Sequence, residues 1–419
     1  MRRLILSIVA FACAAASAAA EDFGGPSASA ELRAICDADR QRLWGAGLCG
    51  PLLIADPISR AAWASTSDTE GALRPAGAGW VGALPPGVPI ANTSLDWAGR
   101  RWIMLAAPLP TDLEEQRVLL AHEAWHRVQD SIGLPQAPST CAHLESEQGR
   151  YLLRLEMRAL SVAMRSRNRA RQRAAEDALR FRAARLALFE NAVFEERALD
   201  RNEGLAAYTG VVLGAEDVSG YAARVLDRHD SHESLSRAYA YATGPAYGIL
   251  LDQFRRTWRS ELTGGAAPAE LLMASFGIGI PSASVLREAA ALYGGPAIAA
   301  EEAARAQAQR ARVDELQARF TSGPRVELPL AQMQLEFDPN QVTPVEGLGS
   351  VYHVITLRDA WGEFRATDGA LISPDFTRVV LARPGADGLS GPGWTLALAP
   401  NLHLAGPDAA GVYRPAPVP

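Results

Sequence analysis

Lysine is absent from this chain, and all 41 positions that hold lysine or arginine are arginine. The net charge is −6, so no overall positive field would draw the protein to nucleic acid, and no such partner is expected. After the first 20 residues no apolar run is long enough to span a bilayer, so stable membrane insertion is not expected. The remaining composition, 48% hydrophobic and 21% charged in 419 residues, is that of an ordinary folded protein with two or three domains.

Cysteine is scarce as well, with four in the chain. Cys13 lies in the N-terminal segment, and Cys36, Cys49 and Cys141 lie beyond it. Cys36 and Cys49 are the nearest of these in sequence, but sequence alone does not fix a disulfide pairing. No activating environment is visible that would make Cys141 a nucleophile.

The N-terminus has the pattern of a secretory signal peptide over residues 1–20. Arg2 and Arg3 precede an apolar run, which ends in small residues before Glu21. This order of charge, apolar core and A-x-A site is typical of a cleaved export signal. We therefore expect an exported protein, periplasmic or secreted, whose mature chain begins at Glu21.

The order of helical and β-like patterns along the sequence predicts an α+β fold, with a mainly helical core, a small N-terminal sheet and a β-rich C-terminal segment. Short β-like runs between Gly and Pro fill residues 21–110, and a helix is expected from a capping box at Thr111 and Glu114 to about Asp130. Further helices are expected over about 193–212, 247–262 and 299–320, and short β-rich runs over 324–419. Residues 21–323 are thus expected to form one region and 324–419 a separate β-rich domain.

An arginine-rich helical hairpin is expected at about 144–190. Arg150, Arg154 and Arg158 recur every four residues, and interspersed leucines supply an apolar stripe. Arginine runs raise the question of nucleic acid or lipid, but interspersed glutamates favour an ordinary solvated helix face. The hairpin is interpreted as an insertion in residues 21–323.

The stretch "LLAHEAWHRVQD" carries the clearest chemistry in the chain. His122 and His126 are four residues apart, so on a helix both imidazoles project from one face, as a zinc site requires. Glu123 points to the side of this pair, where it can take a proton from a water molecule whose pKa the metal lowers. The alternative is two histidines on a half-buried helix without a metal. The pattern H-E-x-x-H favours zinc, with Glu123 as catalytic base.

His122-Glu123-Ala124-Trp125-His126, after a strand expected at 102–109, resembles the motif of the zincin metallopeptidases. The resemblance implies that this strand is the sheet edge that holds the substrate backbone. The metzincin continuation H-x-x-G-x-x-H is absent after Glu123. The third ligand is therefore expected to be an acidic residue on a later helix, as in the gluzincins.

Two glutamates compete as the third metal ligand. Glu203 lies in "NEGLAAY", which is similar to the N-E-G-x-A-x-Y run that carries the third ligand in gluzincin aminopeptidases. Small residues beside it would let its helix pack closely against the histidine helix. Glu145 follows His126 after 18 intervening residues, the spacing in those aminopeptidases, but lacks the signature. Glu203 is favoured, with Glu145 or Glu147 as the alternative and Glu156 further behind.

"YATG" from Tyr241 resembles the Y-x-x-G of gluzincin aminopeptidases, whose tyrosine stabilises the oxyanion. The resemblance implies this role for Tyr241, with Tyr247 and Tyr239 as weaker candidates. The alternative is a tyrosine that only packs where a helix begins. The chain departs from the family in two respects: it has no G-A-M-E-N-like run, and it has Ala207 where thermolysin-like enzymes have a second-shell aspartate. Another group must then orient a ligand histidine.

The resemblance to the gluzincins therefore implies a zinc-dependent peptidase in which His122, His126 and Glu203 hold Zn²⁺, with Glu123 as general base and Tyr241 as oxyanion donor. The expected partner is a peptide or protein substrate. The alternative is a non-hydrolytic zinc-containing periplasmic protein whose β-rich segment binds a partner. An intact Glu123 argues against this alternative, because a site kept for structure needs no base.

Overall fold

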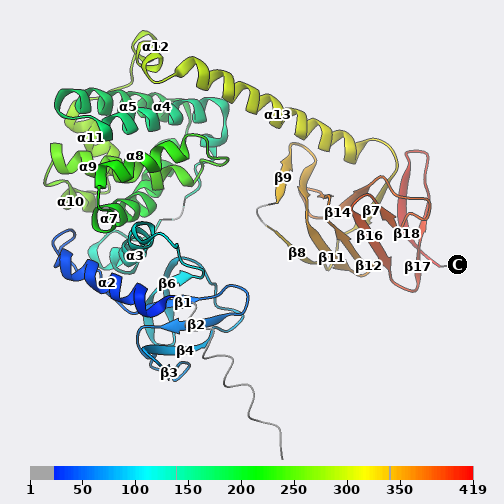
Figure 1. Cartoon of the computed structure of the whole chain (residues 1–419). Coiled ribbons are helices and arrows are strands. Elements are labelled where there is room, and N and C mark those ends of the chain that lie inside the picture. The colour runs from blue at the N-terminus through cyan, green and yellow to red at the C-terminus, as the bar shows by residue number, and fades with distance from the viewer. Residues whose placement is uncertain (1–22, 138, 339–340, 419) are drawn as a thin grey trace, which may run out of the picture. The chain divides into compact units, whose positions relative to one another are not determined.

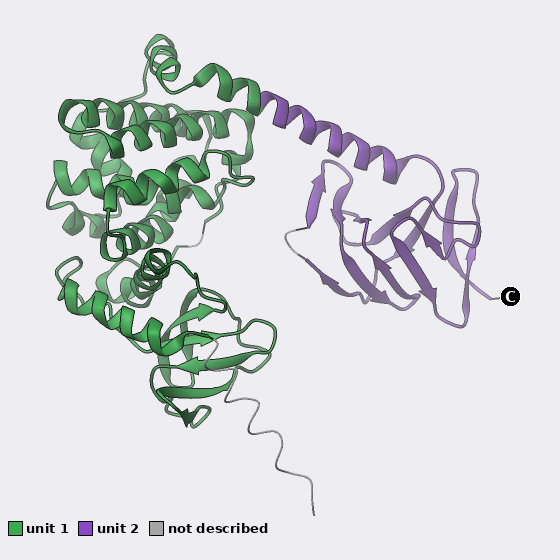
Figure 2. Cartoon of the chain, in the orientation of Figure 1, with its two compact units in different colours: residues 1–302 green, residues 303–419 purple. Residues whose placement is uncertain are grey.

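The computed structural model describes residues 23–137, 139–338 and 341–418. The predicted signal peptide lies outside these described residues. The chain forms two compact units, residues 1–302 (unit 1) and 303–419 (unit 2), each with its own hydrophobic core (Figure 2). The prediction of an α+β fold is confirmed, since unit 1 combines a small sheet with many helices and unit 2 is built mainly of strands (Figure 1). No helix of the described residues is both long and apolar enough to cross a membrane.

A six-stranded sheet begins unit 1, in the order β3-β4-β2-β1-β6-β5. Strand β1 runs parallel to β6, with Leu52 opposite Ile103, and the other pairs are antiparallel. Helices α2 (Gly25–Asp39) and α3 (Leu113–Val128) pack on one face through side chains such as Leu32 and Leu120. The strands are β1 (Leu52–Ala55), β2 (Ala61–Ala64), β3 (Arg74–Ala76), β4 (Gly79–Ala83), β5 (Thr93–Trp97) and β6 (Arg100–Ala106).

The strand expected at 102–109 is β6, but the prediction that it forms the sheet edge was wrong. Ala98 and Gly99 have positive φ values of 47° and 72°, so the chain reverses tightly between β5 and β6. Strand β5 then pairs along β6, with Thr93 opposite Met104, and becomes the edge. The reversal is a local turn, which the short β-like runs of the sequence did not reveal.

Helices make up the rest of unit 1, beginning with α3, and the last of them continues into unit 2. The capping box predicted at Thr111 was one residue off, because the Asp112 side chain caps the helix and accepts a hydrogen bond from Glu115 N at 2.8 Å. The later elements are η1 (Gln129–Ile132), η2 (Ala142–Glu145), α4 (Glu147–Arg165), α5 (Asn168–Leu188), α6 (Ala192–Leu199), η3 (Asp200–Gly204), α7 (Leu205–Gly214), α8 (Val218–His229), α9 (Ala238–Phe254), α10 (Trp258–Glu261), η4 (Leu262–Gly264), α11 (Pro268–Phe276), α12 (Ala283–Leu292) and α13 (Gly295–Thr321).

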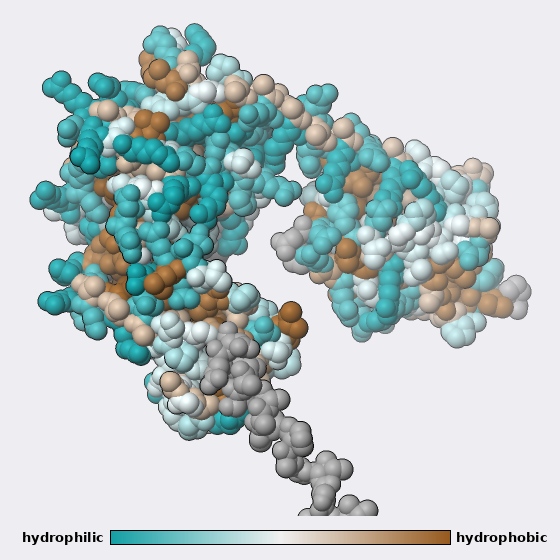
Figure 3. All heavy atoms as spheres, in the orientation of Figure 1, coloured by the Kyte–Doolittle hydropathy of each residue, from teal (hydrophilic) through white to brown (hydrophobic). Residues whose placement is uncertain are grey.

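The arginine-rich hairpin consists of α4 and α5, which pack closely against each other. The interpretation of its arginines as a solvated face was wrong for Arg150, Arg154, Arg182 and Arg185, all of which are buried. Figure 3 shows a mainly hydrophilic visible face over α4, α5 and α8, so the hairpin has an outer polar face as well as this inner one. The buried arginines face carboxylates from neighbouring elements.

We call the innermost of these groups the arginine network, and define it as Arg182, Arg185, Glu156, Glu196 and Asp200. Each of the five residues is at most 3% exposed. Arg185 bonds both oxygens of Glu196, at 2.7 and 2.8 Å, and Arg182 lies 3.1 Å from Glu196 and 3.3 Å from Glu156. Ionised groups are rarely buried unless they are paired, and these are paired with one another.

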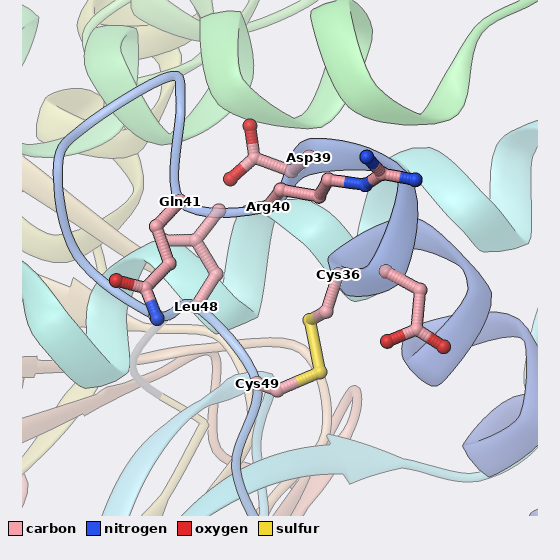
Figure 4. A pocket seen from close by; sticks show the side chains of 8 residues that line it. Cys36, Asp39, Arg40, Gln41, Leu48 and Cys49 are labelled. Carbon is pink, nitrogen blue, oxygen red and sulfur yellow. A yellow bond between two sulfur atoms is a disulfide. The ribbon is translucent and has the colours of Figure 1, made fainter.

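A disulfide joins Cys36 at the end of α2 to Cys49 (Figure 4). The loop between them carries Trp44, whose ring packs 4.3 Å from that of Trp125. Cys141 is a buried free thiol, and burial raises its pKa to about 12. It therefore stays protonated at neutral pH, as expected for a cysteine that is not a nucleophile.

Unit 2 contains a seven-stranded sheet, β17-β18-β7-β14-β13-β10-β9, and a five-stranded sheet, β15-β16-β12-β11-β8. Residues of both sheets, among them Val326, Leu357 and Phe364, form one core. Leu316 and Phe320 near the end of α13 pack on residues of the larger sheet, so this end of the helix belongs to unit 2 although the strands begin only at residue 325. The strands are β7 (Arg325–Pro329), β8 (Gln334–Phe337), β9 (Val342–Val345), β10 (Gly349–Tyr352), β11 (Ile355–Asp359), β12 (Gly362–Ala366), β13 (Ala370–Ile372), β14 (Arg378–Ala382), β15 (Ser390–Gly391), β16 (Trp394–Leu398), β17 (Leu402–Ala405) and β18 (Val412–Pro417).

Candidate metal centre

The two histidines of the H-E-x-x-H motif lie one turn apart on α3. Both are buried, and their Nε2 atoms are 3.2 Å apart. The spacing of four residues brings His122 and His126 to the same face of the helix, as the sequence predicts. Their imidazoles thus converge on one point inside unit 1.

Glu203 reaches the same point from η3, a π-helical turn between α6 and α7. Its Oε2 atom lies 3.4 Å from His122 Nε2 and 3.5 Å from His126 Nε2. Ligand atoms of the three residues all lie within 4.8 Å of one another. His122, His126 and Glu203 are therefore a buried group that could hold a metal ion.

Close helix packing brings α3, η3 and α7 together. The glycines that permit the approach to α3 are not the small residue directly beside Glu203, as the sequence led us to expect. A Cβ added at Gly210 or Gly214 of α7 would come within 2.6 Å of the Val118 backbone on α3, so these two residues allow α7 to approach the histidine helix. The small residue beside Glu203, Gly204, instead meets α9, where a Cβ at Gly244 would lie 2.4 Å from Gly204 Cα.

The charges in the group depend on one another. Burial raises the pKa of Glu203, but the nearby imidazoles of His122 and His126 outweigh burial and hold this pKa well below its usual range. Burial lowers the pKa of His126, yet Glu203 and Glu123 overcome that effect and raise it. The site thus favours a negative Glu203 beside positive charge.

A buried oxygen of Glu203 indicates that a cation fits here. Glu203 Oε2 has no hydrogen-bond partner among the described residues, and it lies 3.4 and 3.5 Å from the Nε2 atoms of the two histidines. A buried carboxylate oxygen without a partner is costly, and a metal ion would supply the missing interaction. Two imidazole nitrogens and one carboxylate oxygen are also a ligand set that transition metals bind in proteins.

Glu123 lies beside the proposed ligands and not among them. It is 3% exposed, and its Oε1 is 3.8 Å from His122 Nε2. Burial raises the pKa of Glu123, Glu203 adds to this effect, and the two histidines oppose it. A carboxylate with a raised pKa beside a metal site has the properties of a general base.

Gln129 was not among the residues predicted from sequence. His126 Nδ1 lies 2.7 Å from Gln129 Oε1, and Gln129 Nε2 donates to Asn202 Oδ1 at 3.1 Å. When Nδ1 donates, Nε2 keeps its lone pair and can coordinate a metal. Gln129 therefore supplies the orienting contact that Ala207 cannot, and its position three residues after His126 was the available signal.

Tyr241 lies on α9 and stacks on His122, with ring centroids 5.4 Å apart and an interplanar angle of 8°. Burial raises its pKa far above the usual range, and the neighbouring Glu203 adds to the effect, so the phenol keeps its proton. Tyr241, His122 and Glu123 line one cavity of about 340 Å³. The other residues that line it are Asn92, Pro110, Glu115, Val118, Leu119, Ala207, Val211, Tyr221, Val225, Arg228 and His229.

The other glutamates considered as third ligand have different partners. Glu145 Oε1 accepts hydrogen bonds from Ser234 Oγ, Leu235 N and Ser236 N at 2.7–2.9 Å. Glu147 is exposed in the first turn of α4. Glu156 belongs to the arginine network and also accepts a bond from Tyr247. The structure therefore brings Glu203, and none of these three, to the histidines.

Comparison of the chain with family models, curated proteins and solved structures finds no match. The geometry of the site and the likeness of its motif are therefore the observations that bear on function.

Proposed function

We propose that this chain is an exported zinc-dependent peptidase. The observation that carries the proposal is the convergence of His122, His126 and Glu203 beside the buried carboxylate of Glu123. This combination supplies a group that could hold a metal and a base beside it, and His122 and Glu123 also line the cavity. The likeness of the motif to the zincins, with a glutamate as third ligand, points to peptide hydrolysis.

Zinc suits the ligand set, because imidazole and carboxylate groups are among the ligands that hold catalytic zinc in proteins. When bound, zinc supplies a Lewis acid that polarises a carbonyl oxygen and lowers the pKa of water. His122, His126 and Glu203 would hold it, and Gln129 would keep the His126 ring in its ligating tautomer.

The chain's own residues would move the protons. Glu123 would take a proton from the attacking water and pass it to the leaving amine, a role that suits a buried carboxylate with a raised pKa. Tyr241 keeps its proton and would donate a hydrogen bond to the oxyanion of the scissile carbonyl. Val118, Val211 and Val225 make part of the cavity wall apolar, which favours a peptide with an apolar side chain there.

Export is supported by the disulfide between Cys36 and Cys49, because such bonds persist in oxidising compartments. This agrees with the signal peptide expected from sequence. The peptide or protein on which the enzyme acts would then be met outside the cytoplasm.

The experiment is turnover of casein and of a mixed peptide library by the purified protein, with and without a chelator. Glu123→Gln is the matched variant, because its amide is nearly isosteric and cannot accept the proton. We expect one equivalent of zinc in both proteins, and turnover at least about 100-fold lower in the variant.

Activity of Glu123→Gln within about tenfold of the wild type would contradict the role of Glu123. Bound zinc with no turnover of any substrate by the wild type would favour the alternative, a non-hydrolytic zinc-containing binding protein. A wild type that binds no metal would contradict both.

A further inference from the structure

Glu203 does not lie on a regular α-helix. Between α6 and α7 the chain widens into η3, where the N–H of Leu205 bonds to the carbonyl of Asp200, five residues back. Turns of this π type are rare and are often found at functional sites. The extra residue per turn sets the direction in which Glu203 points, so whatever holds the turn also controls the approach of Glu203 to the histidines.

The turn is anchored at its first residue. Asp200 Oδ2 accepts a short hydrogen bond from Arg182 Nη2, and both side chains are buried. On the next residue, Arg201 Nη1 donates to the carbonyls of Leu262 and Ala266 at 2.7 and 2.8 Å. The two contacts fix the start of η3, three residues before Glu203.

The same arginine network also reaches α9, which carries Tyr241. Tyr247 donates to Glu156 Oε1 at 2.6 Å, and Tyr239 donates to the carbonyl of Glu196 at 3.1 Å. Glu156 is on α4 and Glu196 on α6. The network therefore joins the hairpin to two elements that carry residues of the proposed site, the turn with Glu203 and the helix with Tyr241.

We propose that the arginine network positions Glu203 for metal binding, and that the Arg182–Asp200 ion pair is the part of the network that does so. Asp200 and Arg182 are then positioning residues of the metal centre. The hairpin α4–α5, expected from sequence to be an insertion, becomes part of the scaffold of the site. This inference rests on the metal centre of the proposed function, and not on peptide hydrolysis.

Asp200→Asn is the best variant, because it keeps the shape of the side chain and removes its charge. Arg185 still holds Glu156 and Glu196 in this variant, so the network loses one ion pair and not its core. Glu302→Gln is the matched control. Glu302 is also a buried carboxylate, and it accepts from Arg150 Nε at 2.8 Å and Arg154 Nη1 at 2.9 Å, but these contacts do not involve η3 or α3.

The measurement is titration of the metal-free proteins with Zn²⁺ against a competing chelator, with Co²⁺ as a second metal whose visible spectrum reports ligand geometry. Asp200→Asn should bind Zn²⁺ at least about tenfold more weakly than the wild type and show an altered Co²⁺ spectrum. Glu302→Gln should bind Zn²⁺ within about twofold of the wild type and keep the spectrum. If Asp200→Asn does not fold, Arg182→Lys replaces it, since lysine keeps the charge but not the forked contact.

Unchanged affinity and spectrum in Asp200→Asn, or in Arg182→Lys where that variant is used, would overturn the proposal. An equal loss in Glu302→Gln would overturn it too, because the effect would then reflect stability alone. If the wild type binds Zn²⁺ and Asp200→Asn binds it equally well, this inference fails but the proposed function is unaffected. A wild type that binds no Zn²⁺ refutes the metal centre and this inference together.

Discussion

Unit 1 contains two buried clusters of carboxylates, which adjoin at Asp200 and Glu203. The two clusters differ in the groups that neutralise their negative charge. In the arginine network, Glu156, Glu196 and Asp200 face two guanidinium groups. In the proposed metal centre, Glu123 and Glu203 face imidazoles, and the guanidinium of Arg237, which lies 3.8 Å from Glu203 Oε1, is largely exposed. A buried charge needs a partner. The first cluster contains its cations, whereas the second has the ligands to take one from outside.

Asp200 and Glu203 show the same contrast, because each belongs to a different cluster. Asp200 and Glu203 are three residues apart, yet one points to Arg182 and the other to His122 and His126. Three carboxylates share two arginines, and burial, partly opposed by Arg182, raises the pKa of Asp200 to about 7. Metal titrations of the Asp200 variant are therefore best made near pH 8, where the wild-type carboxylate is charged.

Arg185→Met should give the largest effect, because it leaves Glu156 and Glu196 with one arginine fewer in a buried site. Breaking a buried ion pair costs about 3–5 kcal/mol, so we expect a loss of this size in the free energy of unfolding. The measurement is urea unfolding of the variant beside Arg173→Met, which removes an exposed arginine of the same helix. Similar midpoints for the two variants would contradict the view that the network holds unit 1 together.

The sequence predicted that His122, His126 and Glu203 come together, but it did not predict this network, and the reason is physical. His122, Glu123 and His126 are placed by the periodicity of one helix, so their geometry follows from local structure. Arg182 and Arg185 lie on a helix whose period is equally clear, but burial depends on whether another helix brings carboxylates to the same face. That is a tertiary property, and the sequence of α5 does not contain it.

The same distinction explains the smaller errors in the prediction of the site. Glu203 was found through a likeness of its surrounding residues, but one continuous helix was expected over 193–212, where η3 interrupts it. Gln129 was missed although its spacing from His126 was visible, because the contact with Asn202 that fixes it crosses from η1 to η3. The sequence patterns did not predict contacts between distant segments of the chain.

Gln129→Ala tests how far the metal centre depends on an orienting contact. The His126 ring would lose the acceptor for its Nδ1 proton, so zinc affinity should fall by about 10–100-fold. Gln116→Ala on α3, the helix that carries His126, serves as control, since the Gln116 side chain donates to the Pro110 carbonyl and not to a proposed ligand. The readout is zinc competition with a chelator, and equal affinities for the two variants would show that Gln129 does not orient His126.

Glu123→Gln should have a smaller effect on stability than Arg185→Met. It should stabilise the metal-free protein, whereas Arg185→Met should destabilise the protein. Burial raises the folded-state pKa of Glu123 above its unfolded value of about 4.3, so the unfolded state loses its proton first and stability falls as pH rises through this window. The variant lacks this group, so at pH 7 it should be more stable than the metal-free wild type.

Urea unfolding of the metal-free wild type and of Glu123→Gln between pH 4 and pH 7 measures this difference. A variant that is clearly less stable than the wild type at pH 7 would mean that the buried charge of Glu123 is already compensated without a metal. The contrast between the two clusters would then not hold.

The most direct test of the central claim is zinc titration of Glu203→Ala and Glu145→Ala against a competing chelator. Glu203→Ala removes the only carboxylate of the group His122, His126 and Glu203, and should lower affinity by more than about 100-fold, beyond what loss of an orienting residue costs. Glu145→Ala should keep wild-type affinity, because Glu145 bonds the chain at Ser234, Leu235 and Ser236. Loss of zinc from Glu145→Ala with zinc retained by Glu203→Ala would contradict the account.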